Sequence, residues 1–386
     1  MQADRIFDAG QAAGSALATS RRPELLALTS VRFFAALEVV LLHTLYELGG
    51  GHARAMPATV IDLLTRGALA VSFFFVLSGF ILAYTYCDDE NELKTTPSKF
   101  WRARFARIYP LYFLGFLLDG PRVLALLLGS GAIVKLGVAA TAYLTLLQAW
   151  HPRVTNTWNT PGWTLSVEAF FYAVFPVFLR LTRRWQFRRL FCVALAIWAL
   201  PILAQAILFQ SGIADPTNAS ARTFWRSFPL LRLPEFVLGV AAGRLFLSKR
   251  LESHQKELRW SGSVALVLIF ALALGARVLP PSVTDAPFGG PLFAVAILAL
   301  ASGAIPTPSW LSGPGLVLLG RASYAVYILH QPLKELFLKL AHFAGLDLPS
   351  PALLLGYLVS LQLFCIALFL WFEDPLRRLI TKSRAS

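Results

Sequence analysis

The sequence predicts an all-α, polytopic integral membrane protein, and three observations carry this prediction. Of 386 residues, 56% are hydrophobic and only 15% are charged, and the mean hydropathy is +0.62. A soluble chain would carry about 25% charged residues. The apolar residues fall in blocks of roughly 18–22, the length that a helix needs to cross a ~30 Å hydrocarbon core. A transmembrane β-barrel would instead show alternating segments of about ten residues, which the sequence lacks.

Eleven apolar blocks follow one another along the chain. They lie near residues 28–48, 62–86, 108–128, 132–149, 164–181, 190–211, 229–247, 262–280, 288–305, 316–340 and 352–373. Lys and Arg gather between the blocks, in segments that the positive-inside rule assigns to the cytoplasm. These segments are Arg21/Arg22, KFWRARFAR, RLTRRWQFRR, residues 244–259 and RRLITKSR.

The basic segments share one side of the membrane only if one of two neighbouring blocks, 108–128 or 132–149, does not cross. The expected architecture is therefore about ten transmembrane helices with one extra re-entrant or interfacial helix. Gly129, Ser130 and Gly131 supply a turn between the two blocks. The protein is expected in the inner or plasma membrane, with both termini cytoplasmic.

Residues 28–375 are expected to form one membrane domain between cytoplasmic tails at 1–27 and 376–386, with Pro375 ending the last helix. The first tail lacks the apolar core of a cleaved signal peptide. The net charge of +14 could suggest nucleic-acid binding. The basic residues lie in short loops between apolar blocks, however, so no nucleic-acid partner is expected. The three cysteines lack metal-ligand spacing, and neither a disulfide framework nor a metal site is indicated.

The first apolar block, SVRFFAALEVVLLHTLYELGG, carries Arg32 and His43. Their separation corresponds to about 1100° of helical rotation, so they share a face within roughly 20° and lie roughly 16 Å apart along the axis. Because ionisable groups are costly in hydrocarbon, this stripe indicates a lined cavity. Neutral imidazole is the usual general base near physiological pH, which suits His43. The structural alternative is that Arg32 reaches the inner headgroups and His43 forms a hydrogen bond between helices.

Three arginines, Arg102, Arg104 and Arg107, lie in the stretch FWRARFARIYPLY between two apolar blocks. They form either an ordinary positive-inside segment or a clamp for phosphate, which guanidinium groups bind bidentately. Arg104 and Arg107 are three residues apart and can face the same way on a helical turn. The stretch therefore offers a candidate site for a phosphate-bearing ligand at the inner surface.

The stretch NTWNTPGWTLSVEAFFY begins with loop-forming residues and continues as a helix. Glu168 is expected in the first outer turn of that helix, where it either complements the helix dipole or meets a substrate. Trp158 and Trp163 are expected at interface depth, where aromatic faces suit sugar rings as well as lipid headgroups. This stretch is therefore a candidate site for a sugar or a lipid headgroup.

Polar residues also interrupt two later apolar blocks. Ser323, Tyr327 and His330 share one helix face, either as a hydrogen-bonded stripe between helices or with a chemical role. Arg232 and Glu235 lie one turn apart, and a structural ion pair is the slightly favoured explanation. Small residues in VSFFFVLSGFIL predict close helix packing; they are Ser72, Ser78 and Gly79.

The predicted orientation sorts the polar residues into two layers. The inner, cationic layer contains Arg32, Arg102, Arg104, Arg107 and Arg321. The outer layer contains His43, Glu168, Arg232, Glu235 and His330, and is rich in His and Glu. This arrangement fits an enzyme better than a transporter, in which broken helices would surround a site at the midplane.

The order and spacing of six motifs resemble the membrane-bound acyltransferase-3 family, from about residue 24 to 378. The motifs are Arg32 with ten intervening residues before His43, FFFVLSGF, Arg104-x-x-Arg107 followed by IYPLY, WTLSVEAFFY, SYAVYILHQP and the closing FEDP. Members of this family move acetyl or other short acyl groups onto carbohydrates, lipids and related hydroxyl compounds. The resemblance implies a ten-helix domain in which His43 is the catalytic histidine and Arg32 its companion.

The resemblance also implies that Arg104 and Arg107 help to hold acyl-CoA and that Glu168 lies near the acceptor. The expected catalytic residues are His43, Arg32 and Glu168; the donor-binding residues are Arg104, Arg107 and Arg321; and the acceptor-binding residues are Trp163, Ser166, Tyr327, His330 and Glu235. No permanently bound cofactor is expected, and acyl-CoA, with acetyl-CoA the default, is the donor. The partners are membrane lipids and a carbohydrate or glycolipid acceptor.

The alternative function is a flippase or exporter for a lipid-linked sugar, which shares the helix count and the polar cavity. Release of free CoA from acetyl-CoA in the presence of acceptor separates the two functions.

Overall fold

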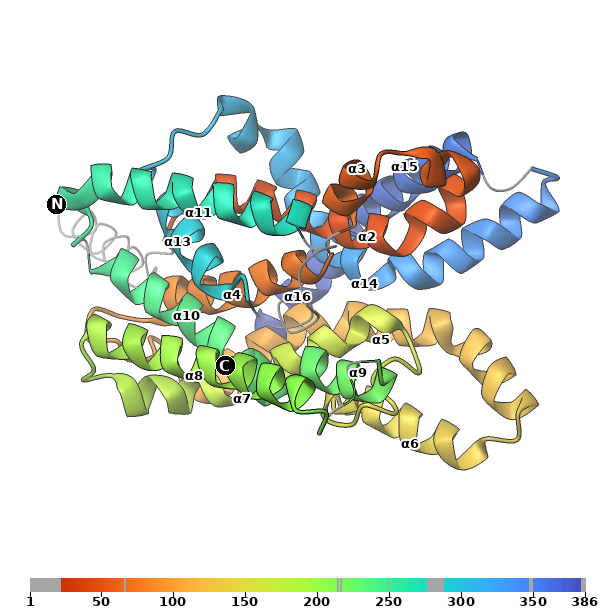
Figure 1. Ribbon diagram of the computed structural model, residues 1–386, viewed down its shortest axis with the longest axis horizontal. Helices are drawn as coiled ribbons and strands as arrows, with labels where there is room; N and C mark the ends of the chain where they lie inside the picture. Colours follow the sequence, from red (N-terminus) through yellow and green to blue (C-terminus); the bar gives the residue numbers. More distant parts are fainter. Residues whose placement is uncertain are drawn as a thin grey trace, which may run out of the picture.

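The computed structural model describes residues 22–65, 67–213, 215, 217–248, 250–275, 288–346 and 350–382. These residues form a bundle of helices that run broadly along the longest dimension of the molecule (Figure 1). The strand-like pairing within the described residues is one isolated bridge between Cys87 and Leu93. The prediction of an all-α protein is therefore confirmed for this part of the chain.

The α-helices are α2 (Leu26–Ala55), α3 (Ala58–Leu64), α4 (Gly67–Tyr86), α5 (Pro97–Gly129), α6 (Ile133–Leu144), α7 (Trp163–Thr182), α8 (Phe187–Gln210), α9 (Ala219–Ser227), α10 (Pro229–Leu247), α11 (Gln255–Gly275), α13 (Gly290–Ala301), α14 (Pro314–Phe343), α15 (Pro351–Leu368) and α16 (Asp374–Lys382). Seven helical segments among the described residues are long and apolar enough to cross a membrane. They are Leu26–Ala55, Ala58–Tyr86, Pro97–Gly129, Thr160–Thr182, Phe187–Gln210, Glu252–Gly275 and Pro351–Lys382. The count of about ten crossings stays a prediction.

The two neighbouring blocks at 108–128 and 132–149 become one long helix and one short helix. α5 has 33 residues, whereas α6 has 12. Twelve residues extend only about 18 Å, which is too short for a ~30 Å core. The turn between the helices uses Gly131 at φ +69°, a backbone conformation that glycine adopts readily. The geometry is compatible with an extra helix that does not cross, and its re-entrant or interfacial placement stays a prediction.

The chain between α6 and α7 folds into the bundle. The side-chain amide of Gln148 donates to the Gly162 carbonyl at 2.7 Å, and that of Asn159 donates to the Ile328 carbonyl at 2.8 Å. Both side chains are buried, so these bonds replace water for polar groups inside the protein. α7 consequently begins within the molecule, and the expectation that Glu168 lies in an outer first turn is wrong, because it lies in the second turn of α7.

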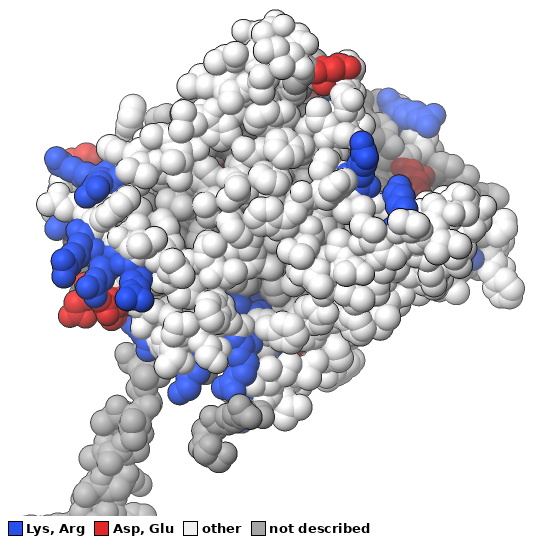
Figure 2. All heavy atoms as spheres, turned by 90° about the horizontal axis from the view of Figure 1, so that it is seen from below, with Lys and Arg blue, Asp and Glu red and all other residues white. Residues whose placement is uncertain are grey.

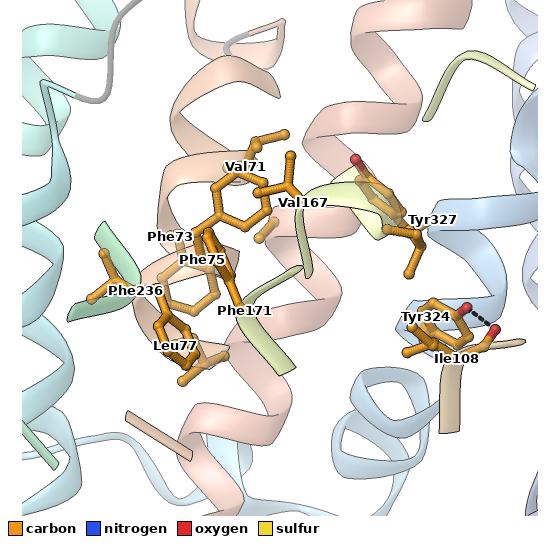
Figure 3. Close-up of a cluster of buried hydrophobic side chains, with 14 of the residues drawn as sticks. Val71, Phe73, Phe75, Leu77, Ile108, Val167, Phe171, Phe236, Tyr324 and Tyr327 are labelled. Carbon is orange, nitrogen blue, oxygen red and sulfur yellow. Dashed lines mark hydrogen bonds between the residues drawn. The ribbon is translucent and has the colours of Figure 1, made fainter. Parts of the chain in front are cut away.

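α4 and α10 cross at two glycines. A Cβ atom on Gly79 would lie 2.1 Å from the Phe236 carbonyl oxygen, and one on Gly239 would lie 1.9 Å from that of Val76. The predicted close approach at Gly79 is therefore confirmed. Figure 3 shows the core beside this crossing, where Phe75, Phe171 and Phe236 come from three different helices.

The helix at the C-terminus continues past Pro375. A π-helical turn at Phe369–Glu373 joins α15 to α16. Pro375 is the second residue of α16, which follows directly on this π-helical turn. The expectation that Pro375 ends the last helix is wrong.

The basic segments gather at one end of the molecule. The Arg183 side chain in the α7–α8 loop pairs with Glu92 after α4, and Arg244 near the end of α10 donates to the Thr182 carbonyl at 3.0 Å. Figure 2 shows many of the Lys and Arg side chains at the left and lower edges of the visible face, a smaller group at the upper right, and a broad region with few charges between them. This clustering agrees with one shared side of the membrane, and which side is cytoplasmic stays a prediction.

Candidate active site

A cavity of about 330 Å³ lies among α2, α4, α5, α7 and α14. Its mouth is beside Pro23 and Glu24, which are exposed just before α2 begins. Its lining follows α4 from Thr85 to Val71, which corresponds to roughly 21 Å of helix. The cavity is therefore a long recess that reaches from one end of the protein toward its middle.

Four arginines line this cavity: Arg22 just before α2, Arg32 from α2, and Arg104 and Arg107 from α5. α5 begins at Pro97, with the Thr96 side chain accepting from the Lys99 amide, so both α5 arginines lie on a formed helix. Their i, i+3 spacing directs them to the same side, as the sequence predicts. The sequence-predicted donor residues Arg104 and Arg107 thus lie in one cavity with Arg32.

Aromatic rings hold Arg104 in place. Its Nη2 donates to the Tyr86 hydroxyl at 2.9 Å, and its guanidinium lies 5.2 Å from the centroid of that ring and 5.8 Å from that of Tyr172. Cation–π contacts of this kind are attractive and orient the guanidinium plane. The buried Nε of Arg104 has no hydrogen-bond partner among the described residues. Arg104 thus keeps one unsatisfied buried donor beside the cavity.

Arg107 pairs with Glu373 from the π-helical turn and lies 5.4 Å from the Tyr324 ring centroid. Arg32, by contrast, has no ion-pair partner within the described part of the chain, although Glu168 and Glu373 interact with it electrostatically. The cavity lining combines four arginines with two carboxylates, Glu24 and Glu168, and Glu373 reaches it only through its pair with Arg107. This balance favours an anionic ligand.

Glu168 shares the cavity with the arginines. The Tyr172 hydroxyl donates to its carboxylate, and the Ser78 hydroxyl donates to the same oxygen at 3.2 Å. The predicted separation of an inner cationic layer from an outer His/Glu layer is wrong for Glu168, because α7 begins inside the bundle and carries this carboxylate toward Arg32.

His43 and His330 form a pair between α2 and α14. Nδ1 of His43 lies 3.0 Å from Nε2 of His330, and the rings stack with centroids 5.1 Å apart. Nδ1 of His330 lies 2.8 Å from the Tyr327 carbonyl oxygen. A carbonyl only accepts, so His330 carries its proton on Nδ1 and presents a lone pair on Nε2 to His43. His43 then carries its proton on Nδ1, which leaves its own Nε2 free to accept a proton.

Tyr327 stands between this pair and the arginine cavity. Its ring lines the cavity, whereas neither histidine does. Its hydroxyl lies 3.0 Å from Oγ1 of Thr164, and its ring centroid lies 5.8 Å from that of Phe74 and 6.4 Å from that of His330. Figure 3 shows Tyr327 with Tyr324 one turn away on α14. The histidine pair therefore lies next to Tyr327, a side chain of the cavity wall.

Arg321 lies outside the cavity lining, at the surface, with its guanidinium 2.5 Å from the Glu24 carboxylate. This hydrogen bond lowers the pKa of Glu24 from its ordinary value. Arg321 thus reaches the cavity only through the Glu24 side chain at the mouth. Arg321 lies near the start of α14 and points toward Glu24. The structure therefore does not bring Arg321 together with Arg104 and Arg107.

Three of the predicted acceptor residues are buried elsewhere. Trp163 packs its ring 6.1 Å from that of Phe75, Ser166 donates to the Leu146 carbonyl at 2.5 Å, and Glu235 pairs with Arg232 at 2.9 Å. None of the three lines the cavity. Their contacts hold helices and the α6–α7 connection together, which matches the structural explanation for the Arg232–Glu235 pair.

Two tyrosines of the cavity lining, Tyr172 and Tyr324, are not predicted as site residues from the sequence, and Ser78 is predicted only to allow close helix packing. Tyr86 and Glu373, which contact Arg104 and Arg107 beside the cavity, are not predicted either. Tyr172 follows Glu168 by four residues, so helical spacing could have identified it. Glu373 lies in the FEDP motif, but its pairing with Arg107 depends on how the last helix packs, which local sequence does not reveal.

Comparison with known proteins shows which family this chain resembles in sequence. A model of an acyltransferase domain matches residues 25–370. The chain is 33% identical over 319 residues to the acyltransferase MdmB of Streptomyces mycarofaciens, covering 78% of this chain and 77% of that protein. It is 32% identical over 325 residues to the exopolysaccharide production protein ExoZ of Rhizobium meliloti, covering 81% and 90%. It is 27% identical over 322 residues to nodulation protein 10 of Rhizobium leguminosarum, covering 78% and 80%.

No solved structure matches the chain. The domain match nevertheless extends over most of the sequence and includes α2, α4, α5, α7 and α14, the helices that build the cavity. The protein thus belongs to the acyltransferase-3 family.

Proposed function

We propose that this protein is a membrane O-acyltransferase that moves an acyl group, acetyl by default, from cytoplasmic acyl-CoA to a hydroxyl of a carbohydrate or glycolipid. The observation that carries this proposal is the arginine-lined cavity with Tyr327 in its wall and the His43–His330 pair next to Tyr327. The names of the relatives support it: MdmB is an acyltransferase, and ExoZ acts in exopolysaccharide production.

The cavity suits the donor in charge and shape. CoA carries phosphates that need cations, and Arg104 and Arg107 offer guanidinium groups that bind phosphate oxygens in pairs. The long recess along α4 suits the thin pantetheine arm, whose thioester is at its far end. Arg32 lies deeper on α2 and has no ion-pair partner among the described residues, so it can position the arm.

His43 supplies the general base in this proposal. Its Nε2 takes the proton of the acceptor hydroxyl while that oxygen attacks the thioester carbonyl. The C–O bond forms, the C–S bond breaks, and the leaving thiolate receives the proton from His43. His330 keeps His43 in the tautomer that this step needs, through the 3.0 Å contact. A covalent variant, in which His43 first takes the acyl group and then passes it on, uses the same residues.

Two residues that line the cavity, Tyr327 and Glu168, have roles in this scheme that differ from those expected from the sequence. The thioester must pass Tyr327 and Phe74 to reach His43, so the Tyr327 side chain acts as a barrier at the end of the donor site. Glu168 lies with the arginines and Tyr172, so we assign it to ordering the donor site rather than to direct contact with the acceptor.

The test combines purified protein with cellular glycans. Surface polysaccharides and lipids from a strain lacking the gene should lack one acyl mass by mass spectrometry. Wild-type protein in detergent, given acetyl-CoA and that unacylated extract, should release free CoA thiol and restore the mass. Translocation of a labelled lipid-linked sugar without any release of CoA would instead support a flippase and refute the enzyme.

A further inference from the structure

A second hollow lies away from the arginine cavity, among α8, α10, α11 and α13. Its volume is about 750 Å³. α8 packs on α10, α10 on α13 and α13 on α11, so the hollow is a groove between the first and the last of these helices. Figure 1 shows the four helices on the same part of the bundle.

The walls and the rim of this groove differ in chemistry. The walls are apolar and come from all four helices; they include Phe187, Phe191, Leu245, Leu258, Val295 and Leu298. The rim carries Arg188, Arg250 and His254, with one carboxylate, Glu257, among the described lining residues. Arg188 and Arg250 are exposed and have no ion-pair partner within the described part of the chain. The groove thus joins an apolar slot to an excess of positive charge.

The groove lies between helices that are candidates to span the membrane. α8 and α11 are among the seven segments apolar enough to cross, and only 17% and 22% of their most apolar windows are buried. Trp260, at the rim, is 72% exposed. Tryptophan is enriched at membrane–water interfaces, and basic pockets between membrane helices bind anionic headgroups.

We propose that this groove is a binding site for a membrane phospholipid with an anionic headgroup. The phosphate contacts Arg188 and Arg250 at the rim, and an acyl chain lies against the walls between α8 and α11. Arg188 and Arg250 lie where the apolar helices meet the aqueous boundary, which is the depth of lipid headgroups. Their positive charge therefore favours an anionic lipid over a protein partner. The proposal does not depend on the acyl-transfer chemistry, since none of these residues lines the arginine cavity.

The test is native mass spectrometry of the delipidated full-length protein with two probe lipids of equal chain length, phosphatidylglycerol and phosphatidylcholine. Wild-type protein should bind the anionic probe roughly 10-fold more tightly. The double variant Arg188→Gln/Arg250→Gln should lose this preference. Val295→Trp, which fills the slot and keeps both arginines, should weaken binding of both probes.

The matched control is Arg184→Gln/Lys256→Gln. It removes two exposed cations beside the same helices that do not line the groove, and it should keep the wild-type preference. The proposal is overturned if wild-type protein binds both probes equally. It is equally overturned if the double variant keeps the preference, or if the control loses it to the same extent as the double variant.

Discussion

The reactivity of His43 depends on one neighbouring side chain. The Tyr327 carbonyl fixes the proton of His330, and His330 in turn fixes that of His43 through contacts of 2.8 and 3.0 Å. His330 is fully buried, so water does not compete for these bonds. An imidazole held this way presents its Nε2 lone pair without having to change tautomer, which is what the proposed general-base role of His43 requires.

Replacing His43 with Ala should lower the rate of acyl transfer by about 10²-fold or more, because a general base contributes at least that factor. Binding of acetyl-CoA, measured by calorimetry, should change little, since His43 does not line the donor cavity. His342→Ala, at the far end of α14, is the matched control and should keep wild-type turnover. Unchanged product formation by the His43 variant would refute the mechanism.

Replacing His330 distinguishes positioning from simple packing. Gln can accept a hydrogen bond near the position of Nε2, whereas Leu cannot. We therefore expect His330→Gln to retain much more turnover than His330→Leu, with the KM for acetyl-CoA similar in both. The pH–rate profile of the Leu variant should shift, because the His43 proton is no longer fixed. Equal kinetics and equal pH profiles of the two variants would contradict the relay.

Replacing Arg104 or Arg107 should weaken the binding of acetyl-CoA rather than slow the acyl-transfer step itself. Arg104→Gln and Arg107→Gln should each raise the KM for acetyl-CoA roughly 10-fold with a smaller change in kcat, because charge-assisted phosphate contacts contribute about 1.5–3 kcal/mol. Lys99→Gln removes an exposed cation from the first turn of the same helix and serves as control. The KM effect should shrink at high salt. A KM that is the same in all three variants would show that the clamp is elsewhere.

At the scale of elements, the pairing of α2 with α14 creates the site. A Cβ atom on Gly320 would lie 2.0 Å from the Thr29 carbonyl oxygen, so this glycine lets the two helices approach closely. The sequence predicts the helices and the shared face of Tyr327 and His330, because both follow from helical spacing. It does not predict that His330 meets His43, because that contact depends on which helices pack together.

Gly320→Ala should separate α2 from α14 and destabilise the protein by about 1–3 kcal/mol, the usual range for overpacking. Thermal unfolding monitored by size exclusion should occur at lower temperature, and turnover should fall because the histidine pair opens. Gly315→Ala lies in the same helix with no atom within 4 Å of its Cβ position, and should be neutral. Equal stability of the two variants would contradict the close approach.

At the scale of the whole molecule, composition and loop charge predict the class of protein and the clustering of its basic segments. They do not predict that the connection between α6 and α7 is partly buried, because its loop-forming residues look like an exposed loop until their partners are known. The side-chain amides of Gln148 and Asn159 donate to backbone carbonyls that lie 14 and 169 residues away in the sequence. That connection places the start of α7 inside the bundle, so that Glu168 lines the arginine cavity.

The same connection gives a prediction for topology. If α6 does not cross, the residues on both sides of it face the same compartment, and the basic α7–α8 loop faces the other. In a Cys192→Ala background, whose two other thiols are buried, single cysteines replace exposed residues at Ser130, Arg153 or Arg184. A membrane-impermeant maleimide applied to intact cells should label the first two, and label the third only after permeabilisation. Protection of the cysteine at Arg153 in intact cells would mean that α6 crosses, and the basic loops would then be divided between the two sides against the positive-inside rule.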